Sequence, residues 1–126
     1  MKILTGTQIK EADRYTIENE PIASIDLMER ASNAISHWIS VNINKQYPFL
    51  FLIGKGNNGG DGLAVARILS QEGYDCSVLL AFDNAVMTDE WKINLDRLPM
   101  EVKPVGPDFI SADTIIVDSL LGTGVT

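Results

Sequence analysis

The sequence predicts an α/β fold built on a mainly parallel sheet, because short apolar segments alternate with amphipathic helical segments along its 126 residues. Three observations carry this prediction. Residues 49–53 form an unbroken apolar run, residues 27–39 repeat apolar side chains at helical spacing, and residues 114–117 form a second apolar run that ends at Asp118. Strands that alternate with helices are typical of right-handed crossovers in one domain.

Two helices are expected before the first strand. Thr7 is placed to cap a helix that reaches about Asn19, and Pro21 interrupts it. The second helix is stronger, and Asp26 with Glu29 resembles a capping box at its start. Its apolar side chains recur along one face that we expect to pack on the core: Leu27, Met28, Ala31, Ala34, Ile35, Trp38 and Ile39.

The remaining elements follow in strand–helix alternation. The run at 49–53 reads as a strand covered on both faces. A glycine-rich loop at 54–62 leads into a helix that starts at Leu63 and stops at Gly73. Four further segments are expected: a strand at 76–81, a helix from about Thr88 with Trp91, Leu95 and Leu98 on its packing face, a weaker strand at 102–105, and a strand at 114–117.

The end of the sequence suggests a fragment. Gly122-Thr123-Gly124 forms a turn after the last strand, and such a turn normally leads into another helix. The chain stops at Thr126, so we expect the domain to be truncated at its C-terminus.

Composition and charge exclude several classes of function. The net charge is −7 and Lys and Arg do not cluster, which argues against a nucleic-acid partner. No run of apolar residues is long enough to span a membrane. Cys76 is the single cysteine, fits a reducing compartment, and is expected to be an inert core thiol.

The glycine-rich segment is the first candidate site. Gly54, Gly56 and Gly59 satisfy G-x-G-x-x-G between a strand and a helix. Glycines let a backbone turn tightly and approach a ligand, and the N-terminus of a helix attracts phosphate. This pattern alone also fits an NAD-linked oxidoreductase, for which Asp83 would contact the ribose.

The polar residues of that segment favour a different chemistry. Asn57, Asn58 and Asp61 crowd a position where the dinucleotide fold of an oxidoreductase has bare backbone, so they argue against that class of enzyme. An alternative stays open, in which Asp61 only caps the following helix and the asparagines only form the turn.

Asp118 is the second candidate. It ends a strand whose carboxyl end should share an edge with the glycine segment if the two strands are neighbours. Its carboxylate, the amide oxygen of Asn58 and nearby carbonyls would form an all-oxygen shell that suits a hard cation. The alternative is that Asp118 only caps the following turn.

Three segments together resemble a known family. Residues 54–62, GKGNNGGDG followed by LAVAR, resemble the signature of the NAD(P)H-hydrate epimerase family, also called the YjeF N-terminal domain. Residues 116–124 resemble its second signature, and residues 27–32, LMERAS, resemble its early helix. NNGGDG paired with D-x-L-x-G-T-G is much more specific than G-x-G-x-x-G.

The resemblance implies a Rossmann-like three-layer αβα sandwich, with residues 1–126 forming an incomplete YjeF N-terminal domain. It implies epimerisation of the R and S forms of hydrated NADH and NADPH, which are small-molecule substrates. It also implies a cytoplasmic homodimer or larger homo-oligomer, in some proteins fused to an ADP- or ATP-dependent dehydratase. Since further site residues of the family lie beyond Thr126, activity of the fragment itself is left open.

The resemblance also implies site residues. A potassium ion is expected, with Asn58 and Asp118 as its ligands. The substrate contacts by motif position are Asn57, Asn58, Gly59, Gly60, Asp61, Gly122, Thr123 and Gly124. Independently, the titratable side chain of Asp61 makes it the candidate acid/base for inverting the hydroxyl-bearing carbon.

Two other functions are less consistent with these motifs. A non-catalytic binding or dimerisation module would have no need of Asn58, Asp61 and Asp118 together. An oxidoreductase would have no reason for NNGGDG, and its substrate domain would lie outside this chain.

His37 lies beside the apolar face of the helix at 27–39 and is expected at the surface.

Overall fold

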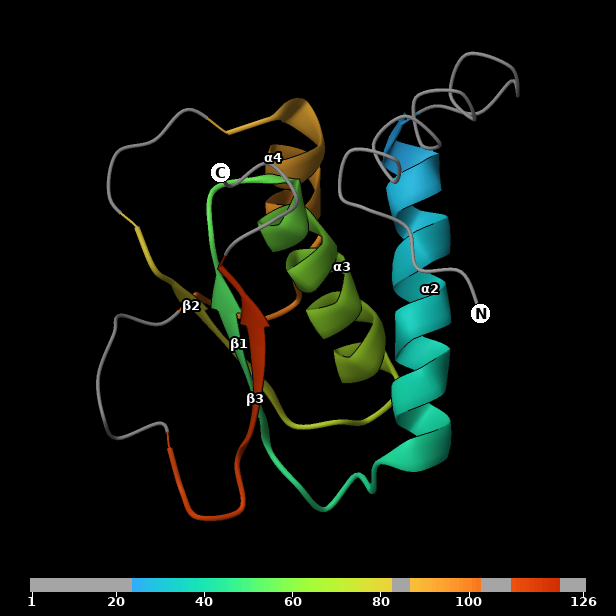
Figure 1. Cartoon of the computed structure of the whole chain (residues 1–126), viewed down its shortest axis with the longest axis vertical. Coiled ribbons are helices and arrows are strands. Elements are labelled where there is room, and N and C mark those ends of the chain that lie inside the picture. Colours follow the sequence, from blue (N-terminus) through green and yellow to red (C-terminus); the bar gives the residue numbers. More distant parts are fainter. Residues whose placement is uncertain (1–23, 83–86, 103–109, 121–126) are drawn as a thin grey trace, which may run out of the picture.

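The computed structural model describes residues 24–82, 87–102 and 110–120 (Figure 1). The helix expected at 7–19, nearly all of the weak strand at 102–105, Asp83, and the turn at 122–124 lie outside those ranges. The elements are α2 (Ser24–Asn42), β1 (Phe49–Ile53), α3 (Asn57–Gln71), β2 (Cys76–Leu80), α4 (Asp89–Asp96) and β3 (Ile115–Ser119).

The three strands form a parallel sheet in the order β2-β1-β3. β1 is central, so Phe49 is paired with Cys76 on one side and with Ile115 on the other. All three carboxyl ends therefore lie at one edge of the sheet. The predicted α/β class with a parallel sheet is confirmed.

Helix α3 packs directly on the sheet, and α2 and α4 pack on α3 (Figure 1). Phe49, Phe51 and Ile53 point from β1 toward α3, where they join Leu63 and Trp91 in the main core. Each of these side chains is almost fully buried, which accounts for the unbroken apolar run of β1.

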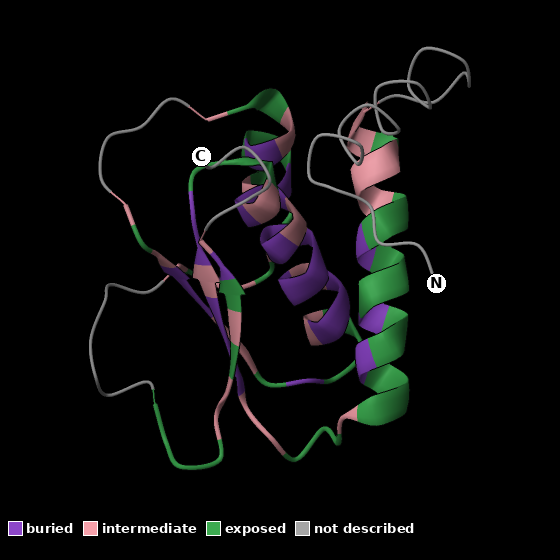
Figure 2. Ribbon diagram, in the orientation of Figure 1, coloured by how far each residue is buried: buried purple, intermediate pink, exposed green. Residues whose placement is uncertain are grey.

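Helix α2 forms as expected but packs through a different face. Its buried residues are Ser32, Ser36 and Ile39, whereas Ile35 and Trp38 are 46% and 61% exposed (Figure 2). The prediction that Trp38 packs in the core is therefore wrong. Small serine side chains allow α2 to approach α3 closely, and this favours the serine face over the bulkier apolar one.

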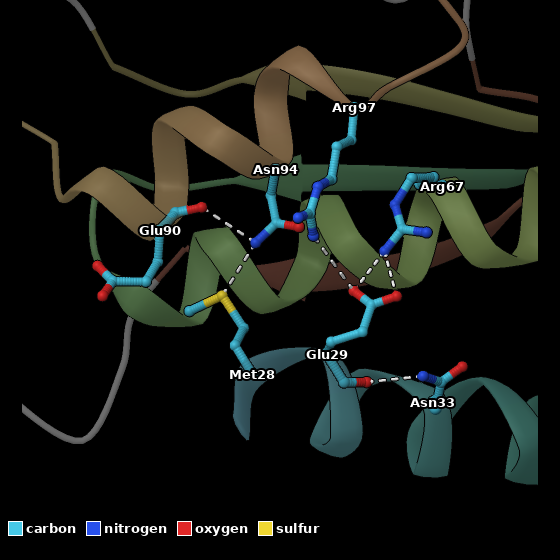
Figure 3. Close-up of polar contacts among 7 residues, drawn as sticks. All are labelled: Met28, Glu29, Asn33, Arg67, Glu90, Asn94 and Arg97. Atoms are coloured by element: carbon cyan, nitrogen blue, oxygen red, sulfur yellow. Dashed lines mark hydrogen bonds and ion pairs between the residues drawn. The ribbon is translucent and has the colours of Figure 1, made fainter. Parts of the chain in front are cut away.

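Figure 3 shows polar side chains that join α2, α3 and α4. Glu29 forms an ion pair with Arg67, and Arg97 of the α4 C-cap lies 3.9 Å from the same carboxylate. Asn94 donates to the Glu90 carbonyl at 3.0 Å. Because α2 begins at Ser24 and Glu29 binds Arg67, the predicted capping box of Asp26 and Glu29 is wrong.

Candidate active site

The candidate site lies at the edge where β1 and β3 end. Leu52 is paired with Asp118 and Ile53 with Ser119. Directly after β1, the Gly54 N–H donates to the Ser119 carbonyl at 3.0 Å. The two strands are therefore neighbours, and the glycine segment lies beside the end of β3 as the sequence analysis required.

Helix α3 begins at Asn57 rather than at the predicted Leu63. Only residues 54–56 form a loop, and Gly56 is the N-cap with extended backbone angles. The predicted substrate residues 57–61 consequently lie in the first turns of α3. Asp61 is the fifth helical residue, so the alternative that it caps this helix is wrong.

The helical glycines are explained by close packing rather than by a loop. A Cβ atom at Gly59 would overlap the Gly54 carbonyl oxygen. A Cβ atom at Gly62 would lie 2.5 Å from Ser119 Oγ and 2.7 Å from Ile53 Cδ1. Glycine therefore holds the start of α3 against the ends of β1 and β3, although it lowers helix propensity.

This packing directs the N-terminus of α3 to the edge of the sheet. The first N–H groups of a helix have no acceptor within the helix, and they carry the positive end of its dipole. The first hydrogen bond of the helical pattern is made by the Gly60 N–H, which donates to the Gly56 carbonyl at 3.2 Å. An anionic ligand is favoured at this end because the N-cap residue has no side chain to cap it.

Helix α4 supports the loop from the other side. Trp91 is only 1% exposed, and its Nε1–H donates to the Gly54 carbonyl at 2.9 Å. Thr88 Oγ1 caps α4 by accepting the Trp91 N–H, and it donates to Asn57 Oδ1 at 3.2 Å. The sequence predicted the burial of Trp91 but none of these three hydrogen bonds. Only the indole bond has a sequence signal, because a buried indole N–H requires an acceptor.

Asp118 has an exposed side chain whose Oδ1 accepts the Leu120 N–H at 3.0 Å. This is the turn-capping contact that the alternative reading expected. Alternation along β3 turns Asp118 to the face opposite that of Ser119, which contacts α3. Its use as a ligand shared with Asn58 stays a prediction, and such an ion would have to lie beyond the strand ends.

The donor chemistry at this edge fits a hard cation. The Asp118 carboxylate, the Asn58 amide and main-chain carbonyls are all oxygen donors. Across residues 24–82, 87–102 and 110–120, no three His, Cys, Asp or Glu side chains gather into a metal-binding group.

Asp61 is half-buried on α3, one turn after Asn57. Residues four apart share one side of a helix, so Asp61 lies on the side that Asn57 presents to Thr88. Its acid/base role stays a prediction, as do the contacts expected from Gly122, Thr123 and Gly124.

A family profile described as YjeF-related protein N-terminus matches residues 24–126. The chain belongs to this family. It is 32% identical over 124 residues to the NAD(P)H-hydrate epimerase of Limosilactobacillus fermentum, covering 97% of this chain and 60% of that protein. It is 33% identical over 150 residues to the bifunctional NAD(P)H-hydrate repair enzyme Nnr of Salinibacter ruber, covering 98% of this chain and 27% of that protein.

The YjeF N-terminal fold also agrees with a solved structure. The crystal structure of yeast ynu0, YNL200c, superposes with a TM-score of 0.76 at 23% sequence identity. The match covers all of this chain and 59% of the yeast chain. This chain thus spans about 60% of the epimerase of L. fermentum and of the yeast protein, and the Rossmann-like α/β expectation is confirmed.

Cys76 and His37 lie outside the candidate site. Burial, with a smaller contribution from the charge of Asp75, raises the pKa of the Cys76 thiol from 9.0 to about 12. Cys76 is half-buried and starts β2, away from the candidate site, and its expected inertness stays a prediction. His37 is exposed as predicted, and none of the described helices is long and apolar enough to cross a membrane.

Proposed function

We propose that this YjeF N-terminal domain, in its complete protein, interconverts the R and S forms of hydrated NADH and NADPH. The observation that carries the proposal is the junction of the α3 N-terminus with the end of β3, held by the Gly54–Ser119 hydrogen bond. Relatives about a third identical over nearly the whole chain carry the name NAD(P)H-hydrate epimerase, and this supports the same assignment.

The substrate's diphosphate is assigned to the N-terminus of α3. Both phosphates are anions, and backbone N–H groups at a helix start bind anions without lysine or arginine. Binding through backbone N–H groups would let a chain with a net charge of −7 hold an anionic dinucleotide. The exposed Asn57 and Gly56 leave this end of the helix open to solvent.

The chemistry requires proton transfer at one hydroxyl. In one route the carbon beside the ring nitrogen loses its hydroxyl as water, while the nitrogen lone pair stabilises the cation that remains. Water then adds to the opposite face and gives up a proton. We assign Asp61 to protonate the leaving hydroxyl and to accept the proton of the added water, so no net proton is consumed.

A potassium ion is assigned to the oxygen donors at the same edge, with Asn58 and Asp118 as the ligands from this chain. Such a cation would supply positive charge beside an anionic substrate. We also assign the protein to the cytoplasm as a homo-oligomer, with a dehydratase fused or separate. The fused arrangement is suggested by the bifunctional relative from S. ruber.

The direct test is turnover of the R epimer of hydrated NADPH, followed by chiral separation with and without potassium chloride. The proposal expects the S epimer to accumulate to equilibrium, faster with potassium. The Asp61→Asn variant should bind the hydrate but not invert it. A protein that binds the hydrate without inversion would be a non-catalytic module, and one that transfers hydride would be an oxidoreductase.

A further inference from the structure

The first turn of α4 lies against the start of α3 (Figure 1). The Trp91 indole binds the Gly54 carbonyl, and the Thr88 hydroxyl donates to Asn57 Oδ1 at 3.2 Å. Further along α3, a Cβ atom at Gly60 would lie 3.6 Å from Trp91 Cα. Gly54 and Gly60 are buried, whereas Asn57 is exposed. Thr88 therefore holds the one side chain of this contact that a ligand at the α3 N-terminus could reach.

We propose that Thr88 is a positioning residue, which turns the amide of Asn57 so that its Nδ2 group donates to a phosphate oxygen of the substrate. The inference rests on the proposed function, because it takes the substrate's diphosphate to lie at the N-terminus of α3. Thr88 would touch no substrate atom and would act only through Asn57.

Two hydrogen bonds fix the direction of the Thr88 hydroxyl. Thr88 is the N-cap of α4, and its Oγ1 accepts the Trp91 main-chain N–H at 3.3 Å. The hydroxyl carries a single proton, which it donates to Asn57 Oδ1. The oxygen of the Asn57 amide is thus held toward α4. The nitrogen lies on the other side of the planar amide, so its two N–H donors face away from α4.

The orientation of this amide matters because the proposed ligand is an anion. Asn57 is the first residue of α3, beside the main-chain N–H groups at the positive end of the helix dipole. A phosphate oxygen accepts from N–H donors and is repelled by an amide oxygen, so only one of the two amide orientations strengthens the site. With Thr88 in place, that orientation is set before the substrate binds, which lowers the entropic cost of binding.

The size of the effect follows from the freedom that Asn57 would regain. Without the Thr88 hydroxyl, Asn57 would sample its staggered χ1 rotamers and both amide orientations. Apparent affinity falls with the population of the binding-competent state, so Thr88→Ala should raise the KM for hydrated NADPH roughly three- to sixfold. Asn57→Ala removes the donor itself and should raise this KM roughly tenfold. Both variants keep Asp61, so kcat should stay within about a factor of two.

The experiment is a double-mutant cycle in the complete protein, with KM and kcat measured for hydrated NADPH. In the Asn57→Ala background, Thr88→Ala should change KM by less than about twofold, because the side chain through which Thr88 acts is gone. Thr88→Ser keeps the hydroxyl and should restore the wild-type KM. The matched control is Ser40→Ala, which removes an exposed hydroxyl from α2 and should leave KM unchanged.

A role of Thr88 in capping α4 alone predicts a different result. Loss of the cap would raise KM by the same factor in the wild-type and Asn57→Ala backgrounds. That result, or an unchanged KM in Thr88→Ala, would overturn the proposal.

A second readout does not depend on turnover. In ¹H–¹⁵N spectra of the wild-type protein, inorganic pyrophosphate should shift the side-chain NH₂ signals of Asn57, and Thr88→Ala should require a higher concentration for the same shift. If these shifts occur but the hydrate is not inverted, the proposed function fails and positioning by Thr88 stands. If the hydrate is inverted but the Asn57 signals do not shift, the proposed function stands and this inference fails.

Discussion

The indole N–H of Trp91 donates to the main-chain carbonyl of Gly54 at 2.9 Å, and both groups are buried. This bond ties α4 to the loop that immediately precedes α3. Thr88 adds a second tie through Asn57. The position of the α3 N-terminus, where we place the substrate's phosphates, therefore depends on a helix that the sequence motifs do not include.

Removing the indole donor should weaken both stability and substrate binding. In Trp91→Phe the Gly54 carbonyl stays buried without its donor, which costs about 1–3 kcal/mol, and the smaller ring adds a packing loss. We expect the free energy of unfolding, measured in urea, to fall by at least this amount. We also expect the KM for the hydrate to rise by a larger factor than kcat falls. The control is Trp38→Phe, which replaces an exposed indole and should change the free energy of unfolding by less than about 0.5 kcal/mol.

The glycines of α3 should separate into required and replaceable positions. Gly59→Ala and Gly62→Ala place a methyl group against backbone or against Ser119, so each should destabilise by several times the gain of about 1 kcal/mol from alanine's helix propensity. Gly56→Ala meets open space, and because Gly56 is the N-cap and not a helical residue, it is the control for steric overlap alone. The measurement is the Tm of the three variants. Equal Tm values would contradict the explanation that close packing requires glycine at positions 59 and 62.

The ion pair between Glu29 and Arg67 should couple α2 to α3. Arg67 is 11% exposed and Glu29 is 30% exposed at their side chains, so water screens the pair only partly. We expect Glu29→Gln and Arg67→Met each to cost roughly 2 kcal/mol, less than a fully buried pair. A double-mutant cycle with both changes measures the coupling, and additive losses would show that the pair is not coupled.

The thiol of Cys76 should resist alkylation in the folded protein. Its pKa of about 12 leaves about a thousandfold less thiolate below pH 9 than the ordinary value of 9.0 does. Because the unfolded thiol ionises first, stability should also fall as pH rises from about 9 to 12. Iodoacetamide labelling followed by mass spectrometry, with urea-unfolded protein as the control, tests the first expectation. Labelling at equal rates in both states would contradict it.

Much of the fold followed from local patterns. The apolar run at 49–53 and the ending of β3 near Asp118 were predicted because buried parallel strands leave a strong one-dimensional signal. The family was recognised from NNGGDG and the β3 signature, and the profile match confirmed it. These features depend on neighbouring residues in the sequence, which is why sequence alone sufficed.

The errors arose where tertiary packing decides. The sequence predicts that α3 starts at Leu63, because glycine and asparagine disfavour helix, but α3 starts six residues earlier at Asn57. The close packing of Gly59 and Gly62 against the strands outweighs that local preference. The packing face of α2 was misassigned because its serines are buried by α3. The bond from Trp91 to Gly54 joins residues 37 apart, and no local pattern reports it.

We place the dinucleotide hydrate where the α3 N-terminus meets the end of β3. The most direct measurement is a two-dimensional ¹H–¹⁵N NMR titration of the protein with hydrated NADPH. The largest amide shifts should fall on residues 54–61 and 118–120. Shifts concentrated on α2, or at the edge of the sheet where Cys76 starts β2, would contradict the account.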